Sequence, residues 1–337
     1  MRIAVDVLGG DHAPGEILAG VAAALRGDFT ADELLLVGPE DVVEQQLRKH
    51  GVGDLPEVLH TTEVVEGHES PIVALRRKPK ASVALCMHAV REGKADGLVS
   101  FGNTGATVAA CTMGLGMLSG IRRPAITVDL RGAGSKFVLL DAGANPSPKP
   151  LHLYQYGLMG AAYTTDMHGI AEPRVGLLNI GGEAGKGDSV TKEAYRLLAE
   201  SNLNFIGNLE GQEIFHGKAD VLLTDGFVGN MLIKVFEGFT EFLFKGLGSL
   251  GSERGDLMEG FRSIFGVAEY SDIGGAVLLG VDGVVLIGHG RSEARAVPSA
   301  LREARRDVEA GVNRHITETL YSNPGAIRAS GTGEVQP

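Results

Sequence analysis

Five glycine-containing segments carry side chains that can bind an anion or move a proton. Each follows a short apolar run, and each combines glycine with Asn, Asp, His or Lys. One such segment alone is ordinary turn chemistry, because Gly-Asn and Gly-Asp favour tight turns. Five at equivalent positions after apolar runs predict one polar site. The segments are residues 9–14, 102–105, 141–146, 179–187 and 225–230.

The segment Gly102-Asn103-Thr104-Gly105 has the composition of an anion-binding turn at a helix start. Free backbone N–H groups and the positive end of the helix dipole favour phosphate there. Glycine lets the backbone approach a ligand closely, and Asn103 or Thr104 can add a side-chain donor. A plain helix cap is the alternative explanation of the same residues.

Lys186 lies between two glycines in the longest segment. It can neutralise phosphate or a developing oxyanion, although a solvated loop lysine is the simpler alternative. The segment does not fit the P-loop pattern, because the spacing before Gly185-Lys186 is wrong and Gly187 replaces the required Ser or Thr. We therefore expect no hydrolysis of nucleoside triphosphates.

The other polar residues of the segments are candidates for proton transfer and orientation. His12 has the side chain of a general acid or base, although it can equally cap the helix that follows Pro14. Asn145 and Asn230 are candidates to orient the reacting groups. The carboxylates predicted to orient the substrate are Asp11, Asp141 and Asp225.

Several reaction classes lack their signatures. There is no GxSxG elbow, no GxGxxG after a strand, and neither Cys86 nor Cys111 lies in a glycine segment. The two cysteines give no disulfide framework and no zinc spacing, so we expect no metal and no cofactor. A net charge of −11 argues against general nucleic-acid binding. The start of the chain does not read as a signal peptide, and no apolar run is long enough to span a membrane, so we expect a cytoplasmic protein.

Short apolar runs alternate with helical patterns almost throughout, which predicts an α/β sandwich with a largely parallel sheet. In such sheets, ligands bind at the carboxyl ends of the strands. We expect one domain over residues 1–322 and a disordered tail over 323–337. The predicted strands are 2–7, 34–37, 98–100, 125–129, 137–141, 175–180, 205–207, 221–224 and 284–287. The predicted helices are 15–25, 39–50, 82–92, 104–118, 151–168, 189–199, 229–247 and about 293–320.

Residues 229–266 are predicted to form a protruding amphipathic arm, because seven of the twelve Phe residues fall between Phe227 and Phe265. Apolar residues follow helical spacing there, with Lys and Glu on the opposite stripe. A second helical piece is expected at 257–265. A core or dimer-interface helix is the simpler reading, and a tip that docks on a membrane is the alternative. The residues expected on the apolar stripe include Phe236, Phe239, Phe242 and Leu243.

Taken together, these motifs resemble those of the PlsX family, the acyl-carrier-protein:phosphate acyltransferases. The resemblance covers residues 1–320 in order. The chain departs from the family pattern at three places. Phe101 replaces a residue that is usually small, Gly182 replaces one that is commonly acidic, and Pro146–Pro148 makes the third segment stiffer. The matching stretches are 1–6 with 9–14, 94–96 with 102–106, 140–145, 175–181 with 186–187, 220–230, 274–283 and 288–290.

The resemblance implies transfer of a long fatty acyl group from acyl carrier protein to inorganic phosphate. The acyl phosphate would then feed glycerol-3-phosphate acylation in phospholipid synthesis. It further implies a three-layer α/β/α fold similar to phosphotransacetylases and to isocitrate and isopropylmalate dehydrogenases, a homodimer, and cytoplasmic action with peripheral contact at the inner face of the membrane. Phosphate is itself a nucleophile, so positioning and charge stabilisation can carry the reaction.

An acidic carrier protein needs a local basic surface on this acidic chain. The residues expected to bind it are Arg76, Arg77, Lys78 and Lys80, with Arg122 and Arg123 as a second group. Three other functions stay open: a small-acyl coenzyme A phosphotransacetylase, a metal-dependent nicotinamide dehydrogenase of similar architecture, and a non-catalytic membrane-associated scaffold. The dehydrogenase lacks its Asp ligands and dinucleotide site, and the scaffold leaves the five polar segments unexplained.

Overall fold

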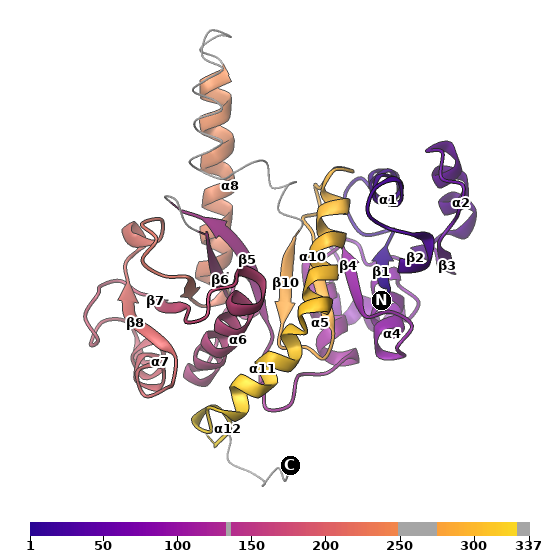
Figure 1. The fold of residues 1–337 in the computed structure, drawn as a ribbon. Coiled ribbons are helices and arrows are strands. Elements are labelled where there is room, and N and C mark those ends of the chain that lie inside the picture. Colours follow the sequence, from indigo (N-terminus) through magenta and orange to yellow (C-terminus); the bar gives the residue numbers. More distant parts are fainter. Residues whose placement is uncertain (133–135, 249–274, 329–337) are drawn as a thin grey trace. The chain divides into compact units, whose positions relative to one another are not determined.

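A computed structural model describes residues 1–132, 136–248 and 275–328 (Figure 1). They divide into two compact units, whereas the sequence predicted one domain. Unit 1 comprises Met1–Met117 and Val267–Gly311, and unit 2 comprises Leu118–Gly266 and Val312–Pro337. The boundary was not readable from the sequence because the chain passes between the units three times without a Pro- or Ser-rich linker.

Unit 1 is built on a sheet with the strand order β3-β2-β1-β4-β11-β10. All neighbours are parallel except β10, which is antiparallel to β11. The central strands β1 and β4 are buried along their whole length, which explains their continuous apolar runs. The strands are β1 Ile3–Asp6, β2 Leu34–Gly38, β3 Glu57–His60, β4 Gly97–Ser100, β10 Ala276–Leu279 and β11 Val284–Ile287.

Two groups of helices flank this sheet. The first group consists of α3, α4 and α5. Helix α4 contacts β1, β2 and β4, and α5 packs on both α4 and α3. In the other, α10 contacts β1, β4 and β11 and packs on α1, which in turn contacts α2. The helices are α1 Gly15–Arg26, α2 Glu40–Lys49, α3 Pro71–Arg77, α4 Ser82–Arg91, α5 Thr104–Gly114 and α10 Ala296–Ala310.

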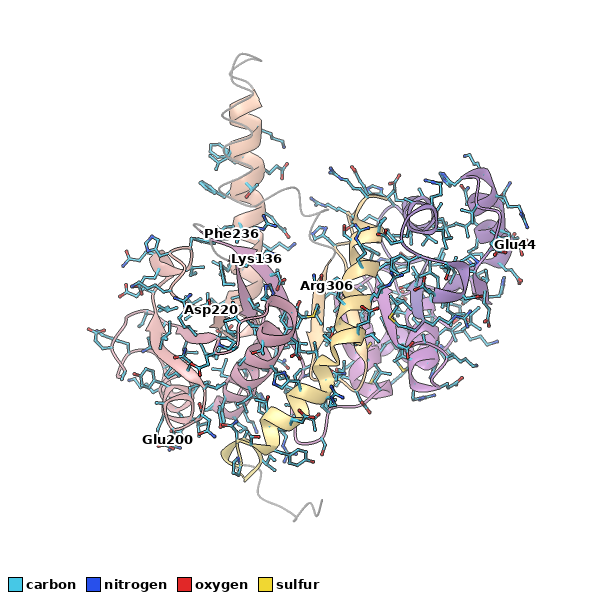
Figure 2. All side chains as sticks on the ribbon, in the orientation of Figure 1. Glu44, Lys136, Glu200, Asp220, Phe236 and Arg306 are labelled. Carbon is cyan, nitrogen blue, oxygen red and sulfur yellow. The ribbon has the colours of Figure 1, made fainter. Side chains whose placement is uncertain are left out.

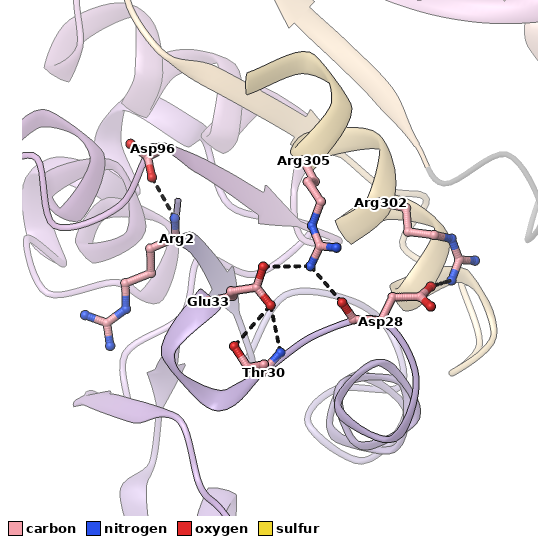
Figure 3. Close-up of polar contacts among 7 residues, drawn as sticks. All are labelled: Arg2, Asp28, Thr30, Glu33, Asp96, Arg302 and Arg305. Carbon is pink, nitrogen blue, oxygen red and sulfur yellow. Dashed lines mark hydrogen bonds and ion pairs between the residues drawn. The ribbon is translucent and has the colours of Figure 1, made fainter. Parts of the chain in front are cut away.

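A polar cluster fixes α10 against the segment that leads into β2 (Figure 3). The guanidinium of Arg305 donates to Glu33 Oε1 and to the backbone oxygen of Asp28, both at 3.0 Å. It also lies 3.7 Å from the centre of the Phe29 ring. The other oxygen of Glu33 accepts from the backbone N–H of Thr30 at 2.8 Å, which with the Thr30 hydroxyl forms a capping box. These contacts fix α10 to the connection between α1 and β2.

Unit 2 has the strand order β5-β6-β9-β7-β8, again parallel except for β5, which is antiparallel to β6. Helix α6 contacts β6, β7 and β9 and packs on α7, α11 and α12. Helix α8 contacts β6 and extends well beyond the strands of this unit (Figure 1). The strands are β5 Ala125–Arg131, β6 Lys136–Leu140, β7 Arg174–Leu178, β8 Asn204–Leu209 and β9 Val221–Leu223. The helices are α6 Pro150–His168, α7 Ser189–Ala199, α8 Gly226–Gly248, α11 Val312–Tyr321 and α12 Gly325–Arg328.

The nine predicted strands are all present, and the parallel sheet flanked by helices is confirmed. Strands β3 and β10 and helix α3, each of seven residues or fewer, were not predicted. The predicted helix over about 293–320 is two helices. Gly311 separates them in a left-handed conformation, with φ of 68°.

The predicted arm and tail are only partly described. Helix α8 covers the first part of the arm, whereas the helical piece expected at 257–265 lies outside the described residues. At the start of the predicted tail, Asn323 is 6% exposed and its amide donates to Thr319 O at 2.9 Å, and α12 follows. The structure therefore places residues 323–328 in unit 2. Residues 329–337 lie outside the described part.

Candidate active site

Three glycine-containing loops meet at the carboxyl edge of the unit 1 sheet. They follow the adjacent strands β1, β4 and β11. A Cβ built on Gly9 would lie 2.7 Å from the Gly102 nitrogen, so this close approach requires glycine. The Asp11 N–H donates to the Gly290 oxygen at 2.7 Å, which joins the third loop. Phe101, fully buried, packs its ring against Gly288.

The start of α5 has the geometry of both a cap and an anion site. Asn103 Oδ1 accepts from the Ala106 N–H at 3.0 Å, and its Nδ2 donates to the Glu66 oxygen at 3.1 Å. The Asn103 side chain is therefore occupied by the helix cap and by the 61–70 loop. Thr104 and Gly105 begin the helix, where N–H groups have no intrahelical acceptor. Within the described residues no acceptor is found for these two N–H groups, and both residues are exposed.

His12 and Asp11 are both exposed on the loop after β1. The His12 backbone oxygen accepts from the Glu16 N–H at 3.2 Å, so its backbone leads into α1. No hydrogen bond to its imidazole is found in the described part of the chain. The His12 ring is therefore accessible beside the loops that meet in unit 1.

Asp141, at the end of β6 in unit 2, organises the loop that follows it. Its Oδ1 accepts backbone N–H groups from Ile126, Gly143 and Ala144 at 2.9–3.0 Å, and its Oδ2 accepts the Asn145 N–H at 2.6 Å. The residue has no exposed surface. Burial raises the pKa of Asp141, and these four backbone donors oppose that rise. The carboxylate is thus used by the backbone and has no free oxygen to orient a substrate.

Asn145 also holds structure. Its Nδ2 donates to the Pro124 oxygen at 2.6 Å and to the Tyr156 hydroxyl at 2.8 Å. Its backbone oxygen accepts the Gly226 N–H at 2.9 Å, which ties the loop after β6 to the loop after β9. The amide nitrogen that was predicted to hold the reacting carbonyl is therefore already occupied.

Asp225 and Asn230 have different roles at the start of α8. Asp225 Oδ1 accepts the N–H groups of Phe227 and Val228, both at 2.9 Å, so Asp225 caps this helix. Asn230 is exposed, and its side chain lies close to Gly143 on the neighbouring loop. Of the two asparagines predicted to orient reacting groups, Asn230 has the accessible side chain.

Lys186 is exposed at the carboxyl end of β7, and no acceptor for its ammonium is found in the part of the chain that the structure describes. Its loop is held independently of the side chain. Asn179 Nδ2 donates to the Lys186 backbone oxygen at 3.1 Å, and Asn208 Nδ2 donates to the Glu183 oxygen at 2.8 Å. The result is a fixed backbone that carries an unpaired cation.

The predicted carrier-binding residues differ in accessibility. Lys78 Nζ donates to Glu69 Oε2 at 2.6 Å and to the Val64 oxygen at 2.9 Å, so its charge is already neutralised. The other basic side chains are exposed and make no ion pair within the described ranges. They are Arg76, Arg77 and Lys80 in unit 1 and Arg122 and Arg123 in unit 2.

The predicted residues thus gather at one sheet edge in each unit. Gly102–Gly105 and His12 belong to unit 1, whereas Asn145, Lys186 and Asn230 belong to unit 2. Four further residues that support the loops were not predicted from the sequence: Asp6, Ser100, Asn179 and Tyr156. Asp6 and Ser100 are each the last residue of an apolar strand before a glycine loop, a signal that could have found them.

Both cysteines are free and buried, and burial raises the pKa of each thiol, to about 12 for Cys111. Neither is a nucleophile in this state. Among the described residues, no cluster of three or more His, Cys, Asp or Glu side chains could hold a metal ion.

Known structures share this fold. A phosphotransacetylase from Streptococcus pyogenes superposes with a TM-score of 0.62 at 18% identity, over 92% of this chain and 94% of that one. A phosphotransacetylase from Staphylococcus aureus gives a TM-score of 0.59 at 16% identity, over 91% and 94%. The predicted fold class, mainly parallel α/β with helices on the sheet, is confirmed.

Sequence relatives are closer. Phosphate acyltransferase from Pelotomaculum thermopropionicum is 43% identical over 343 residues, which cover 99% of this chain and 98% of that protein. The enzyme of the same name from Desulfitobacterium hafniense is 43% identical over 95% of this chain and 98% of its own length. The family model described as fatty acid synthesis protein matches residues 1–315. The chain therefore belongs to the fatty acid synthesis protein family, and the predicted membership of the PlsX acyltransferases is confirmed.

Proposed function

We propose that this enzyme transfers a long-chain acyl group from acyl carrier protein to inorganic phosphate. The product, an acyl phosphate, is then used in phospholipid synthesis. The observation that carries this proposal is the first turn of α5, whose free N–H groups lie beside two further glycine loops in unit 1. The relatives named phosphate acyltransferase support the choice of phosphate as the anion.

The reaction needs no side-chain nucleophile. An oxygen of the bound phosphate attacks the thioester carbonyl, the C–S bond breaks, and the carrier thiol leaves with a proton. The N–H groups of Thr104 and Gly105 bind the phosphate, and the helix dipole of α5 stabilises its charge. Chemistry of this kind depends on positioning and on charge stabilisation, which the fixed loops supply.

Each remaining polar residue has a separate proposed role. Lys186 neutralises charge on the phosphate or on the tetrahedral oxyanion, because it is an unpaired cation on a fixed loop. Asn230 orients the thioester carbonyl, and the exposed His12 supplies the proton to the departing sulfur. Asn145, Asp141 and Asp225 act indirectly, by holding the loops that carry the accessible groups.

The acidic carrier protein docks on α3 in this proposal. Arg76 and Arg77 are exposed there next to Ile72 and Val73, which are 49% and 45% exposed. Helix α3 also packs on α5, and Pro71 lies against Gly105, so this surface borders the proposed phosphate site. Charge complementarity favours an acidic partner at this position.

Charge reversal tests the docking surface. The double variant Arg76→Glu, Arg77→Glu should raise the KM for acyl carrier protein by about tenfold or more at low salt, with a smaller effect at high salt. The matched control is Arg48→Glu, on α2 of the same unit. An unchanged KM would contradict docking on α3 and would leave Arg122 and Arg123 as the basic group to test.

Helix α8 is proposed to contact a second copy of the chain. Along it, four apolar side chains are at least 51% exposed: Met231, Val235, Phe239 and Phe242. Phe236, which is labelled in Figure 2, instead packs on Phe215 with ring centres 4.3 Å apart. An exposed apolar stripe of this kind marks an interaction surface. No helix among the described residues is long and apolar enough to cross a membrane. Light scattering of a Phe239→Ser, Phe242→Ser variant should show a monomer, and vesicle flotation tests peripheral membrane contact as the alternative.

Phosphate-dependent release of carrier thiol tests the function itself. Palmitoyl-acyl carrier protein and acetyl-coenzyme A are compared as donors at limiting phosphate. We expect release from the carrier substrate that requires phosphate and yields acyl phosphate, which hydroxylamine traps. Faster turnover of acetyl-coenzyme A would instead support a small-acyl phosphotransacetylase.

A further inference from the structure

A buried acid lies directly beneath the proposed phosphate loop. Asp6 is the last residue of β1, and it is 1% exposed. A Cβ on Gly9 would lie 2.7 Å both from Asp6 Oδ2 and from the Gly102 nitrogen, so the carboxyl group sits where the two loops touch. The reaction proposed above does not use this residue.

Asp6 is linked to the phosphate loop through one hydroxyl group. Ser100 Oγ donates to Asp6 Oδ2 at 2.7 Å and accepts the Gly102 N–H at 3.2 Å. Ser100 is itself fully buried at the end of β4. The chain Asp6–Ser100–Gly102 therefore fixes the residue from which the anion-binding turn begins.

The surroundings of Asp6 favour the uncharged acid. No Lys, Arg or His in the described part of the chain forms an ion pair with it, and its Oδ1 is buried without a hydrogen-bond partner. The Ser82 hydroxyl on α4 lies near the carboxyl group and is also buried without a partner, so a proton on Asp6 would satisfy both groups. The titratable group that faces it from α4 is Cys86, an uncharged thiol. Burial raises the pKa of Asp6, and the nearby Ser82 and Ser100 hydroxyls together with the backbone N–H groups of Leu8 and Gly9 oppose that rise.

We propose that Asp6 is a positioning residue of the phosphate loop: at neutral pH its side chain is an uncharged acid and, through Ser100, sets the position of Gly102 beside the bound anion. This inference rests on the proposed phosphate site. An ionised Asp6 would place a negative charge directly under the phosphate, where the interior dielectric screens it little. The uncharged acid holds the loop without that repulsion.

The test measures the KM for phosphate and kcat of three proteins: wild type, Asp6→Asn and Ser100→Ala. Asparagine keeps the shape of the neutral acid and cannot ionise. The ratio of wild-type to Asp6→Asn KM for phosphate is measured at about pH 6 and at about pH 9, and we expect it to rise with pH because only the wild-type side chain can ionise and repel the anion. The ionisation of phosphate itself cancels in this ratio. Ser100→Ala should raise the phosphate KM by about fivefold at both pH values, with kcat less affected.

The control is Asp307→Asn, which makes the same change at a buried carboxyl on α10 of unit 1. The ratio of wild-type to Asp307→Asn KM for phosphate should not change with pH. If the ratio of wild-type to Asp6→Asn KM for phosphate is also independent of pH, Asp6 has a purely structural role and the proposal is overturned. If Asp6→Asn does not fold, infrared spectroscopy of wild type labelled with ¹³C-aspartate decides: the carbonyl band of a buried protonated acid at neutral pH supports the proposal, and its absence contradicts it. If the wild-type enzyme shows no phosphate-dependent release of thiol, the proposed function is overturned, and the role of Asp6 with it.

Discussion

Replacing Lys186 by methionine should lower kcat/KM for phosphate strongly while leaving the fold unchanged. The Lys186 ammonium has no acceptor in the described residues, and its loop is held by Asn179 and Asn208 through backbone oxygens. Methionine keeps most of the apolar stem that lies over Gly181. The change therefore removes charge and little else.

The magnitude follows from the number of contacts that the ammonium makes. One hydrogen bond between a charged donor and a charged acceptor contributes about 1.5–3 kcal/mol, which corresponds to a loss of about 10- to 150-fold in kcat/KM. Because the side chain is exposed and unpaired, the free energy of unfolding should change by less than about 0.5 kcal/mol.

The assay is thiol release at limiting phosphate, with urea denaturation in parallel. The matched control is Lys192→Met, which removes the same charge from the exposed face of α7 in the same unit. We expect Lys192→Met to retain wild-type kinetics. A Lys186→Met enzyme with unchanged kcat/KM for phosphate would refute the role given to this residue, and so would an equal loss in both variants.

Three further changes test the loops of unit 2. Asp141→Asn replaces a carboxylate that accepts four backbone N–H groups with an amide that is partly a donor. Urea denaturation should show a loss of about 3 kcal/mol in the free energy of unfolding. A loss under about 1 kcal/mol would show that the loop does not depend on the carboxylate. Gly229→Ala places a Cβ over the Asp141 carbonyl oxygen, so it should lower the free energy of unfolding by about 1–3 kcal/mol and reduce turnover. A variant with the thermal stability of wild type would contradict this. Asp220→Asn breaks the bidentate contact with Arg174, at 2.8 and 2.9 Å, and should cost about 2 kcal/mol at neutral pH. Burial raises the pKa of Asp220 but Arg174 lowers it by more, so the folded-state pKa lies below the unfolded value of about 3.9. The stabilisation is therefore present above that value and is lost as pH falls through the folded pKa, so a difference between variant and wild type that persists unchanged in acid would contradict the assignment.

The sequence predicted the elements well where the physical signal was local. Buried parallel strands such as β1 and β4 appear as continuous apolar runs, and the glycine loops follow them directly. Because parallel strands share one carboxyl edge, the sequence also predicted that the polar segments lie at strand ends, although it assigned all five to one site and did not divide them between two units. The short edge strand β3, with exposed Glu57 and His60, has no such run and was missed.

The roles of the polar side chains were harder to predict. Asn103, Asp141 and Asp225 have the residue types of a binding site, but each accepts backbone N–H groups of its own loop. The same Asn or Asp can cap a helix or bind a ligand, and only the positions of neighbouring donors decide which. Lys186 and Asn230 differ from them because their side chains stay exposed, which depends on packing far away in the sequence.

The number of structural units was also not predictable from local pattern. Residues 275–311 belong to unit 1 although they follow a long segment of unit 2, and residues 312–328 belong to unit 2 again. Only Gly311 marks the third crossing, and a single glycine within a helical pattern is an uncertain boundary. Contacts between distant segments, such as Arg305 with Glu33, define the units instead.

The most direct test of the account is the requirement for phosphate in thiol release from palmitoyl-acyl carrier protein. Free carrier thiol is titrated over time with and without inorganic phosphate, and acyl phosphate is trapped with hydroxylamine. We predict that thiol and acyl phosphate appear together, in equal amounts, only when phosphate is present. Thiol release that is independent of phosphate, or none at all from a folded enzyme, would contradict the assignment of the α5 turn as the site of the attacking anion.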